Sequence, residues 1–204
     1  MKIDPEIAEL IGAFIGDGYI TSENYVVGFA GDKYLDRDYF LNFLYPLLVK
    51  KFDVCPRIYF RKDENTIMLK VRSKILVKIF LSWGFKPGIK SRIVSIPDSI
   101  LKNKKLLNPC LRGIFDTDGC VFYDRRTVYS RPYPRITLQS ASITLIEQIE
   151  AHLSENFKVY TYKKARDGYR NYVEIYGHKQ LEMFLKQIGF SNNRHFSKIN
   201  APVA

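Results

Sequence analysis

Apolar residues recur along the chain in two patterns. Residues 5–17 carry apolar side chains at the three- and four-residue spacing of a helix with one buried side, and Asp4 precedes them as a candidate N-cap. Residues 57–62 and 66–72 instead alternate between polar and apolar side chains, as strands with one buried face do. Both patterns return in the second half of the chain, so we expect two halves built from the same elements.

The periodicity predicts the same order of elements twice. In the first half we expect helices at 5–17, 35–50 (kinked by Pro46) and 74–83, with strands at 19–20, 25–30, 57–62 and 66–72. In the second half we expect helices at 109–118, 143–156 and 179–188, with strands at 121–124, 135–140, 158–163 and 169–176. Residues 84–105 are expected to form a linker containing a short helix at 98–102. The predicted fold class is α+β, with two pseudo-symmetric αββαββα halves, 1–103 and 104–204, each an antiparallel sheet backed by helices.

An internal repeat supports the two halves. The segment LIGAFIGDG, residues 10–18, matches LRGIFDTDG, residues 111–119, at an offset of 101 residues. Further on, residues 83–85 match residues 188–190 at an offset of 105. Two matches in the same order indicate that the whole half is duplicated, with length differences confined to loops.

The repeated segments suggest a metal site. Small residues spaced four apart on each predicted helix would let the two helices pack closely: Gly12, Gly16, Gly113 and Thr117. Asp17 and Asp118 would then meet at the C-terminal helix ends, where partial negative charge and unpaired carbonyls disfavour an acid unless a cation compensates. Such oxygen ligands suit Mg²⁺. Paired Mg²⁺ sites near a symmetry axis fit phosphodiester hydrolysis, although a single Asp-Gly is also a common helix ending.

Charge points to a polyanionic partner. The 204 residues include 32 Lys and Arg against 21 Asp and Glu, a net charge of +11. The two halves carry 16 cations each, which excludes a single basic tail and favours a binding surface spread over both. The three cysteines and three histidines show no metal-ligand spacing. With no apolar run of transmembrane length and no secretory signal, we expect an intracellular protein.

The two segments resemble the double signature of the LAGLIDADG homing endonucleases. The second segment fits the signature at Leu111, Gly113, Asp116, Asp118 and Gly119. The first fits at Leu10, Gly12, Asp17 and Gly18, and has Ile15 where the signature has Asp. The chain is similar over essentially its whole length to the compact, monomeric members with two motifs.

The resemblance implies a fold and a chemistry. Two saddle-shaped sheets would form one concave surface over the DNA major groove, with the signature helices as the interface between halves. Asp17 and Asp118 would each bind Mg²⁺, helped by the carbonyls of Gly16 and Thr117, with Mn²⁺ or Ca²⁺ as substitutes for binding. Each site would cut one strand and leave short 3′ overhangs.

The resemblance also implies polar residues near each scissile phosphate. Lys90 lies in the matching loop of the first half, although a solvated loop lysine explains it equally well. Lys198, or Arg194, is the candidate in the second half, and Gln139 resembles the residue that positions water. Ala30 matches Gln139 at the repeat offset of 109, so we expect the two sites to be asymmetric.

The expected partner is double-stranded DNA with a long, pseudo-palindromic or asymmetric target, bound by a monomer away from membranes. Alternating cations and aromatic residues on predicted strands and turns suit a groove-facing sheet, with most cations contacting phosphates. The candidate DNA contacts are Tyr25, Arg57, Tyr59, Arg61, Lys70, Arg72, Arg125, Arg126, Arg131, Arg135, Thr137, Gln139, Tyr160, Tyr162, Lys164, Arg170 and Tyr172.

Two other functions remain open. A catalytically silent relative could bind nucleic acid as an RNA maturase or a transcription regulator, and a maturase could also retain cleavage. A dedicated binder has no need for two acids facing a polyanion, so Asp17 and Asp118 favour cleavage. A self-splicing intein is disfavoured because it needs a nucleophile first and an Asn at the last junction, whereas this chain begins with Met1 and ends with Ala204. We expect a free-standing, intron-encoded enzyme.

Overall fold

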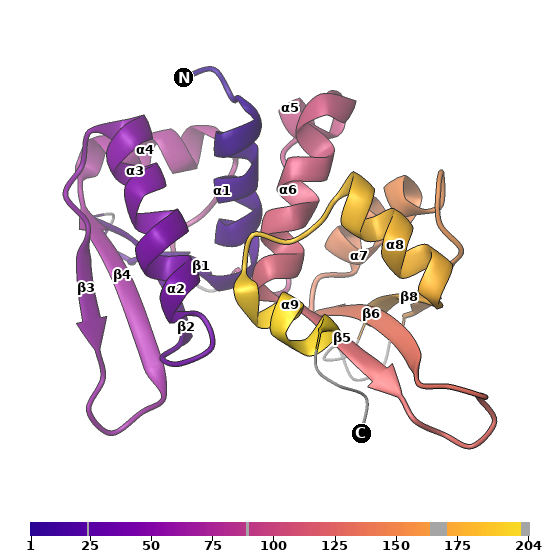
Figure 1. Ribbon diagram of the computed structural model, residues 1–204. Coiled ribbons are helices and arrows are strands. Elements are labelled where there is room, and N and C mark those ends of the chain that lie inside the picture. Colours follow the sequence, from indigo (N-terminus) through magenta and orange to yellow (C-terminus); the bar gives the residue numbers. More distant parts are fainter. Residues whose placement is uncertain (24, 89, 164–170, 201–204) are drawn as a thin grey trace.

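Two four-stranded antiparallel sheets flank a central pair of helices in a computed structural model, which describes residues 1–23, 25–88, 90–163 and 171–200 (Figure 1). The first half contains α1 (Pro5–Asp17), β1 (Gly18–Ile20), β2 (Val26–Asp32), α2 (Arg37–Tyr39), the π-helical turn η1 (Phe40–Leu44), α3 (Tyr45–Phe52), β3 (Arg57–Phe60), β4 (Thr66–Arg72) and α4 (Lys74–Ser82). The second contains α6 (Lys104–Thr117), β5 (Gly119–Asp124), β6 (Tyr133–Ser140), α7 (Ile143–Leu153), β7 (Val159–Tyr162), β8 (Asn171–Tyr176), α8 (His178–Gln187) and α9 (Asn193–Ile199). Between them lies α5 (Asp98–Leu101).

The two sheets share one topology. Their strand orders are β1-β2-β4-β3 and β5-β6-β8-β7. Gly18 pairs with Phe29 in the first sheet, and Gly119 pairs with Leu138 at the equivalent place in the second. The α+β class and the repeated order of elements predicted from the sequence are therefore confirmed.

The two cores repeat the same aromatic contact. Phe14 of α1 packs on Phe80 with ring centroids 4.6 Å apart, and Phe115 of α6 packs on Phe184 at 5.1 Å. Phe14 and Phe115 hold the same place in the two signature segments. Each motif helix is thus anchored in the core of its own half by one large buried side chain.

Three local features differ from the predicted elements. Helix α6 begins at Lys104, five residues before the predicted start at Pro109. Asn103 caps this end, and the first turns are anchored by the buried side chain of Leu107. Near Pro46 the expected kink takes the form of η1, a widened turn beside a residue that cannot donate to the helical ladder. Helix α9 was not predicted; it is short, and its cap Asn192 is the main local signal.

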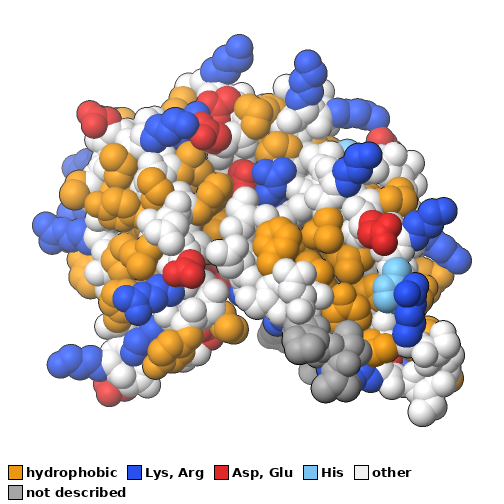
Figure 2. All heavy atoms as spheres, in the orientation of Figure 1, with side chains coloured by type: hydrophobic (Ala, Val, Ile, Leu, Met, Phe, Trp, Pro, Cys, Tyr) orange, Lys and Arg blue, Asp and Glu red, His pale blue; other side chains and the backbone are white. Residues whose placement is uncertain are grey.

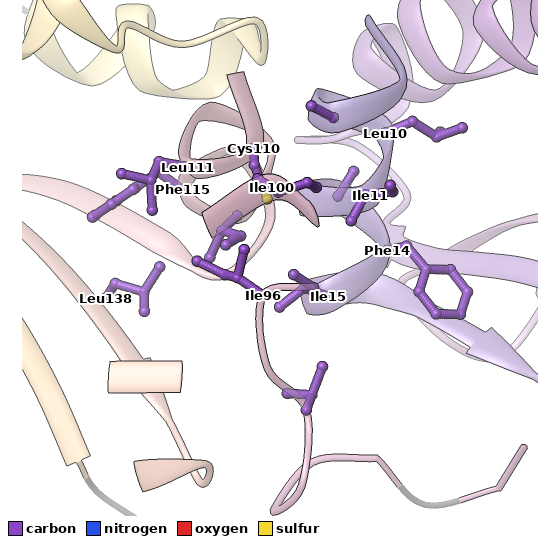
Figure 3. Close-up of a cluster of buried hydrophobic side chains, with 14 of the residues drawn as sticks. Leu10, Ile11, Phe14, Ile15, Ile96, Ile100, Cys110, Leu111, Phe115 and Leu138 are labelled. Carbon is purple, nitrogen blue, oxygen red and sulfur yellow. The ribbon is translucent and has the colours of Figure 1, made fainter. Parts of the chain in front are cut away.

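Helices α1 and α6 lie side by side at the centre of the molecule (Figure 1). A Cβ atom on Gly12 would overlap the carbonyl oxygen of Cys110, and one on Gly113 would overlap the carbonyl oxygen of Glu9. The helices are therefore in backbone contact, which only residues without a side chain permit. In Figure 3, Leu10 and Phe14 point away from α6, and Leu111 and Phe115 point away from α1.

The sheets form an arch beneath this helix pair. Helices cover one face of each sheet, and the strands run outward and downward on both sides (Figure 1). The space-filling view shows the lower side hollowed between the halves (Figure 2). Helices α1 and α6 both run toward this hollow, so their C-terminal ends lie at its roof. Among the described residues, every helix is too short or too polar to cross a bilayer.

Candidate active site

Two acids lie together where α1 and α6 end. Asp17 is the last residue of α1, and Asp118 follows the last residue of α6. A Cβ atom on Gly16 would overlap the Thr117 side chain and lie 3.2 Å from Cγ of Asp118, so the second acid sits against the end of the first helix. Asp17 is half-buried and Asp118 is exposed, which leaves the pair accessible from the hollow.

The surroundings make it costly for both acids to be charged. Loss of water and the nearby carboxyls of Asp118 and Asp36 together raise the pKa of Asp17 to about 8, against the opposing effect of Arg194 and Lys90. Desolvation also raises the pKa of Asp118, although the cations Lys90 and Arg194 oppose this change. A bound cation would remove the conflict.

Lys90 provides one such cation. Its Nζ donates to the carbonyl oxygens of Phe14, Ile15 and Gly16, at 2.8 Å for Gly16, and so caps the C-terminal end of α1. Burial lowers the pKa of Lys90 to about 8 even though the neighbouring carboxyls of Asp118 and Asp17 act to raise it. The structure therefore brings this lysine to the acids.

Arg194, on α9, holds the corresponding place in the second half. Its guanidinium donates to the carbonyl oxygen of Thr117 at the end of α6, and its Nη1 lies 2.9 Å from Oδ1 of Asp36. Lys198 lies one turn further along α9, exposed, with Nζ 3.5 Å from Sγ of Cys120. Of the two cations considered in this half, Arg194 is the one that reaches the helix end.

The strand register places Gln139 beside the second acid. Continuing the β5–β6 pairing by one residue places Gln139 opposite Asp118, and continuing β1–β2 places Ala30 opposite Asp17. Gln139 is exposed beside the second acid. The two ends thus differ in their cation and in the presence of an amide side chain.

Buried polar residues behind the acids were not found from the sequence. Asp116 accepts hydrogen bonds from the backbone N–H groups of Ser191 and Asn192 at 3.0–3.1 Å, and burial raises its pKa to about 7. Glu9 of α1 pairs with Arg112 of α6 at 3.1 Å and accepts from the Ser191 hydroxyl. Asp36 is 2% exposed. For Glu9 and Asp116 the local signal is polarity at positions where the helical pattern calls for apolar side chains.

The donor set fits a hard divalent cation. Within the described ranges, no three His, Cys, Asp or Glu side chains are grouped closely enough to hold a metal by themselves. Two carboxyls and the carbonyl oxygens of Gly16 and Thr117 are available, and these carbonyls already attract the cations Lys90 and Arg194. Mg²⁺ commonly uses one or two carboxylates and takes its other ligands from water and phosphate.

The concave face of the first sheet is cationic. Arg57 and Lys70 are cross-strand partners on it, with Tyr59 and Arg72 at alternate positions, and Nζ of Lys70 lies 5.2 Å from the Tyr59 ring centroid. Arg61 lies beyond β3 and pairs with Glu64 at 2.6 Å. Val26 is the cross-strand partner of Arg72 and so lies on this face. Tyr25 directly precedes Val26, and its ring contacts Lys74. Because successive side chains of a strand point to opposite faces, Tyr25 does not lie on the cationic face, contrary to the prediction.

The second sheet is more aromatic and internally paired. Arg135 lies 2.9 Å from both Asp124 and Glu174, with Thr137 opposite Glu174. Two tyrosine pairs stack on the same face, Tyr160 on Tyr176 at 4.2 Å and Tyr162 on Tyr172 at 5.4 Å.

The β5–β6 hairpin turn carries the remaining candidates. Arg126 pairs with Asp124 at 2.6 Å, and Arg125, Arg126 and Arg131 are all exposed. The candidate contacts Lys164 and Arg170 lie outside the described residues.

A pseudo-twofold α+β arch with an acid at the end of each interface helix defines a two-motif, single-chain class of protein. A LAGLIDADG-like domain matches residues 107–189. The homing endonuclease I-DmoI, solved with DNA and Mn and also with DNA and Ca, shares the fold; with the Mn complex the TM-score is 0.61 at 18% identity, covering 91% of this chain and 96% of that one. The N-terminal LAGLIDADG domain of DUF199/WhiA gives 0.58 at 15% identity, covering 91% and 82%.

A curated sequence relative is the Replication factor C small subunit of Thermococcus kodakarensis. It is 30% identical over 198 residues, which are 96% of this chain and 21% of that protein. This chain therefore spans about a fifth of the length of that relative. The domain match in the second half and the shared fold over 91% of the chain make this chain similar to LAGLIDADG proteins that carry two motifs in a single chain.

Proposed function

We propose that this protein is a site-specific DNA endonuclease that cuts both strands with the help of divalent metal ions. The observation that carries the proposal is the pairing of Asp17 and Asp118 at the roof of an arch lined by cations. A surface that only bound DNA would gain nothing from two acids facing phosphate, whereas hydrolysis needs oxygen ligands there. The fold shared with I-DmoI, itself solved with DNA and Mn, supports this choice.

In this proposal, different residues of the chain bind the metal and contact the phosphate. The unprotonated carboxyls of Asp17 and Asp118, with the carbonyls of Gly16 and Thr117, would hold the metal, which supplies a more acidic bound water and stabilises the leaving oxygen. Lys90 and Arg194 lie beside the acids and would neutralise negative charge on the phosphate.

The amide of Gln139 would orient water beside Asp118, and Ala30 offers no equivalent beside Asp17. The two strands should then be cut at unequal rates.

The finer features belong to the same proposal. Mg²⁺ is the expected natural ion, the ends are expected to carry short 3′ overhangs, and the protein is expected to act as a monomer on a long duplex target. The gene is expected to lie in an intron, in a compartment that contains DNA. Equal numbers of cations in the two halves support a target that spans the whole arch.

Selection from a randomised duplex library tests the proposal. The protein is incubated with the library and Mg²⁺, and cut molecules are captured by their new ends and sequenced. We expect one family of related sequences, cut in both strands with a stagger. Enrichment of bound duplexes in a Mg²⁺-free arm, with no cut molecules in the Mg²⁺ arm, would instead support a binding protein.

The second candidate function is nucleic-acid binding without cleavage, as a transcription regulator or an RNA maturase. The fold shared with the DUF199/WhiA domain favours it, as does the stacked tyrosine face of the second sheet. In that case Asp17→Asn and Asp118→Asn would leave the biological activity of the protein unchanged.

A further inference from the structure

Asp36 is a buried carboxylate of the first half whose side chain accepts hydrogen bonds from the second half and from its own loop. It precedes α2 and is 2% exposed. Its Oδ1 accepts from Nδ2 of Asn192 at 2.7 Å and from Nη1 of Arg194 at 2.9 Å, and its Oδ2 accepts from the backbone N–H of Asp32 at 2.8 Å. The carboxylate thus connects the first half to both ends of the turn that starts α9.

Arg194 is held in place on several sides. Besides the contact with Asp36, it donates to the carbonyl oxygens of Thr117 and Gly119, and its Nε lies 3.3 Å from Nε2 of His195. An arginine presents its donors in a rigid fork, so an anchor on one nitrogen orients the others. Asp36 occupies the Nη1 side of that fork, and Thr117 at the second site occupies the Nη2 side.

The cation of the first site has a different support. Nζ of Lys90 contacts three carbonyl oxygens of α1 and the Phe14 ring, whose centroid lies 5.2 Å away. Within the described residues, no carboxylate of the second half forms a hydrogen bond or ion pair with this lysine. The cation of the first site is therefore held by the backbone of its own half, although it also lies near Asp118, whereas the cation of the second site is held in part by a carboxylate of the opposite half.

We infer that Asp36 is a positioning residue for the second site: it orients Arg194 across the interface, so that cutting of one DNA strand depends on a carboxylate of the opposite half. The inference rests on the proposed nuclease function. Loss of the negative charge at Asp36 would release one end of the guanidinium and leave the first site with its lysine intact. Loss of such an outer contact typically lowers activity by about 10- to 100-fold.

Strand-resolved cleavage tests the inference. A duplex target carries a different label on each strand, and single-turnover nicking of each strand is followed with Mg²⁺. Arg194→Gln identifies the strand that depends on the second site, and Lys90→Gln identifies the other strand. We expect Asp36→Asn to slow the Arg194-dependent strand by about 10-fold or more and to change the other strand by less than about threefold. The product should then accumulate as a nicked duplex.

A matched control separates positioning from a general effect of charge. Asp38→Asn removes the same charge two residues away, from an exposed side chain, and is expected to leave both strand rates unchanged. Thermal melting of each variant shows that the rates are compared on folded protein. Equal slowing of both strands by Asp36→Asn, or the same strand bias from Asp38→Asn, would overturn the inference.

A DNA-free measurement keeps the inference distinct from the nuclease proposal. The side-chain N–H signals of Arg194, assigned by their loss in Arg194→Lys, should be protected from solvent exchange in the native protein and in Asp38→Asn. Protection should be lost in Asp36→Asn. If these signals behave as expected but no duplex is cut by the native protein, the nuclease proposal fails and the positioning contact stands. Protection that persists in Asp36→Asn would show that Asp36 does not orient Arg194.

Discussion

The ends of the two motif helices share a backbone frame and differ in nearly every polar side chain around it. At the first end Asp17 is joined by Lys90 and Ala30; at the second, Asp118 is joined by Arg194 and Gln139. The frame is duplicated because helix contact requires small residues on both sides. The surrounding polar groups are less constrained, provided that each end keeps an acid and a compensating cation.

Ile15 and Asp116 account for part of this difference. They hold the same place in the two segments, yet Asp116 accepts the backbone N–H groups of Ser191 and Asn192 and so fixes the start of α9. Ile15 has no acceptor in its side chain, and the chain after Lys90 forms a turn at 91–93. One half therefore delivers its cation from a helix and the other from a loop.

The largest expected effect tests what the two ends have in common. Asp17→Asn and Asp118→Asn should each reduce double-strand cleavage by roughly a thousandfold, the upper range for loss of one charge-stabilising group. Binding measured without Mg²⁺ should remain within a few-fold of native, because Asn keeps the size of the side chain and removes a negative charge facing DNA. Cleavage assays and gel-shift titrations measure the two properties. Undiminished cleavage by either variant would contradict the assignment.

The contact between α1 and α6 should contribute to stability equally from both helices, in contrast to the unequal cation sites. Gly12→Ala and Gly113→Ala each place a methyl group onto a backbone carbonyl of the facing helix, so both should lower the free energy of unfolding by similar amounts, about 3 kcal/mol. Urea unfolding followed by circular dichroism measures the loss. Ala13→Gly, on the same helix, is a useful reference because it changes the backbone propensity without adding atoms. A large loss from only one glycine variant would show that the two helices contribute unequally.

How far the sequence predicts this structure depends on the range of the interactions. The bounds of α1 follow from local signals: Asp4 accepts from the N–H of Ile7 at 2.9 Å, and Pro5 opens the helix. The sequence predicts the start of α6 too late, because proline usually begins a helix. Here burial of Leu107 extends the helix from Pro109 back to Lys104, toward the N-terminus.

The site shows the same limit more clearly. The pairing of Asp17 with Asp118 follows from a repeat that is visible in one sequence. The contact between Asp36 and Arg194 joins residues 158 positions apart, and no periodic pattern predicts it. The sequence suggested Lys198 with Arg194 as the alternative, because the direction of a side chain on α9 depends on a helix that was not predicted.

Stability should depend on pH through the acids. A carboxyl whose pKa is raised in the folded protein binds its proton more tightly there than in the unfolded chain, so stability decreases as pH rises from the unfolded pKa, near 3.8, to the folded one, about 8 for Asp17. We expect metal-free protein to lose stability between pH 5 and pH 8, and Asp17→Asn to lose less over the same range. Urea unfolding at several pH values measures this slope. A variant with the native slope would show that Asp17 does not titrate in this window.

The smallest expected effect concerns the two sheet faces. Arg57 and Arg72 are exposed on the cationic face, whereas Arg135 is 16% exposed at its side chain and lies between Asp124 and Glu174. Removal of one phosphate contact lowers the slope of log affinity against log salt by about 0.9. We therefore expect Arg57→Ala and Arg72→Ala each to lower the slope by about that amount, and Arg135→Ala to leave it nearly unchanged because its charge is already compensated. Fluorescence anisotropy titrations of a labelled duplex between 50 and 200 mM salt, without Mg²⁺, measure the slope. An equal decrease for Arg135→Ala would mean that this arginine leaves its carboxylates for the DNA, and the two faces would then bind phosphate alike.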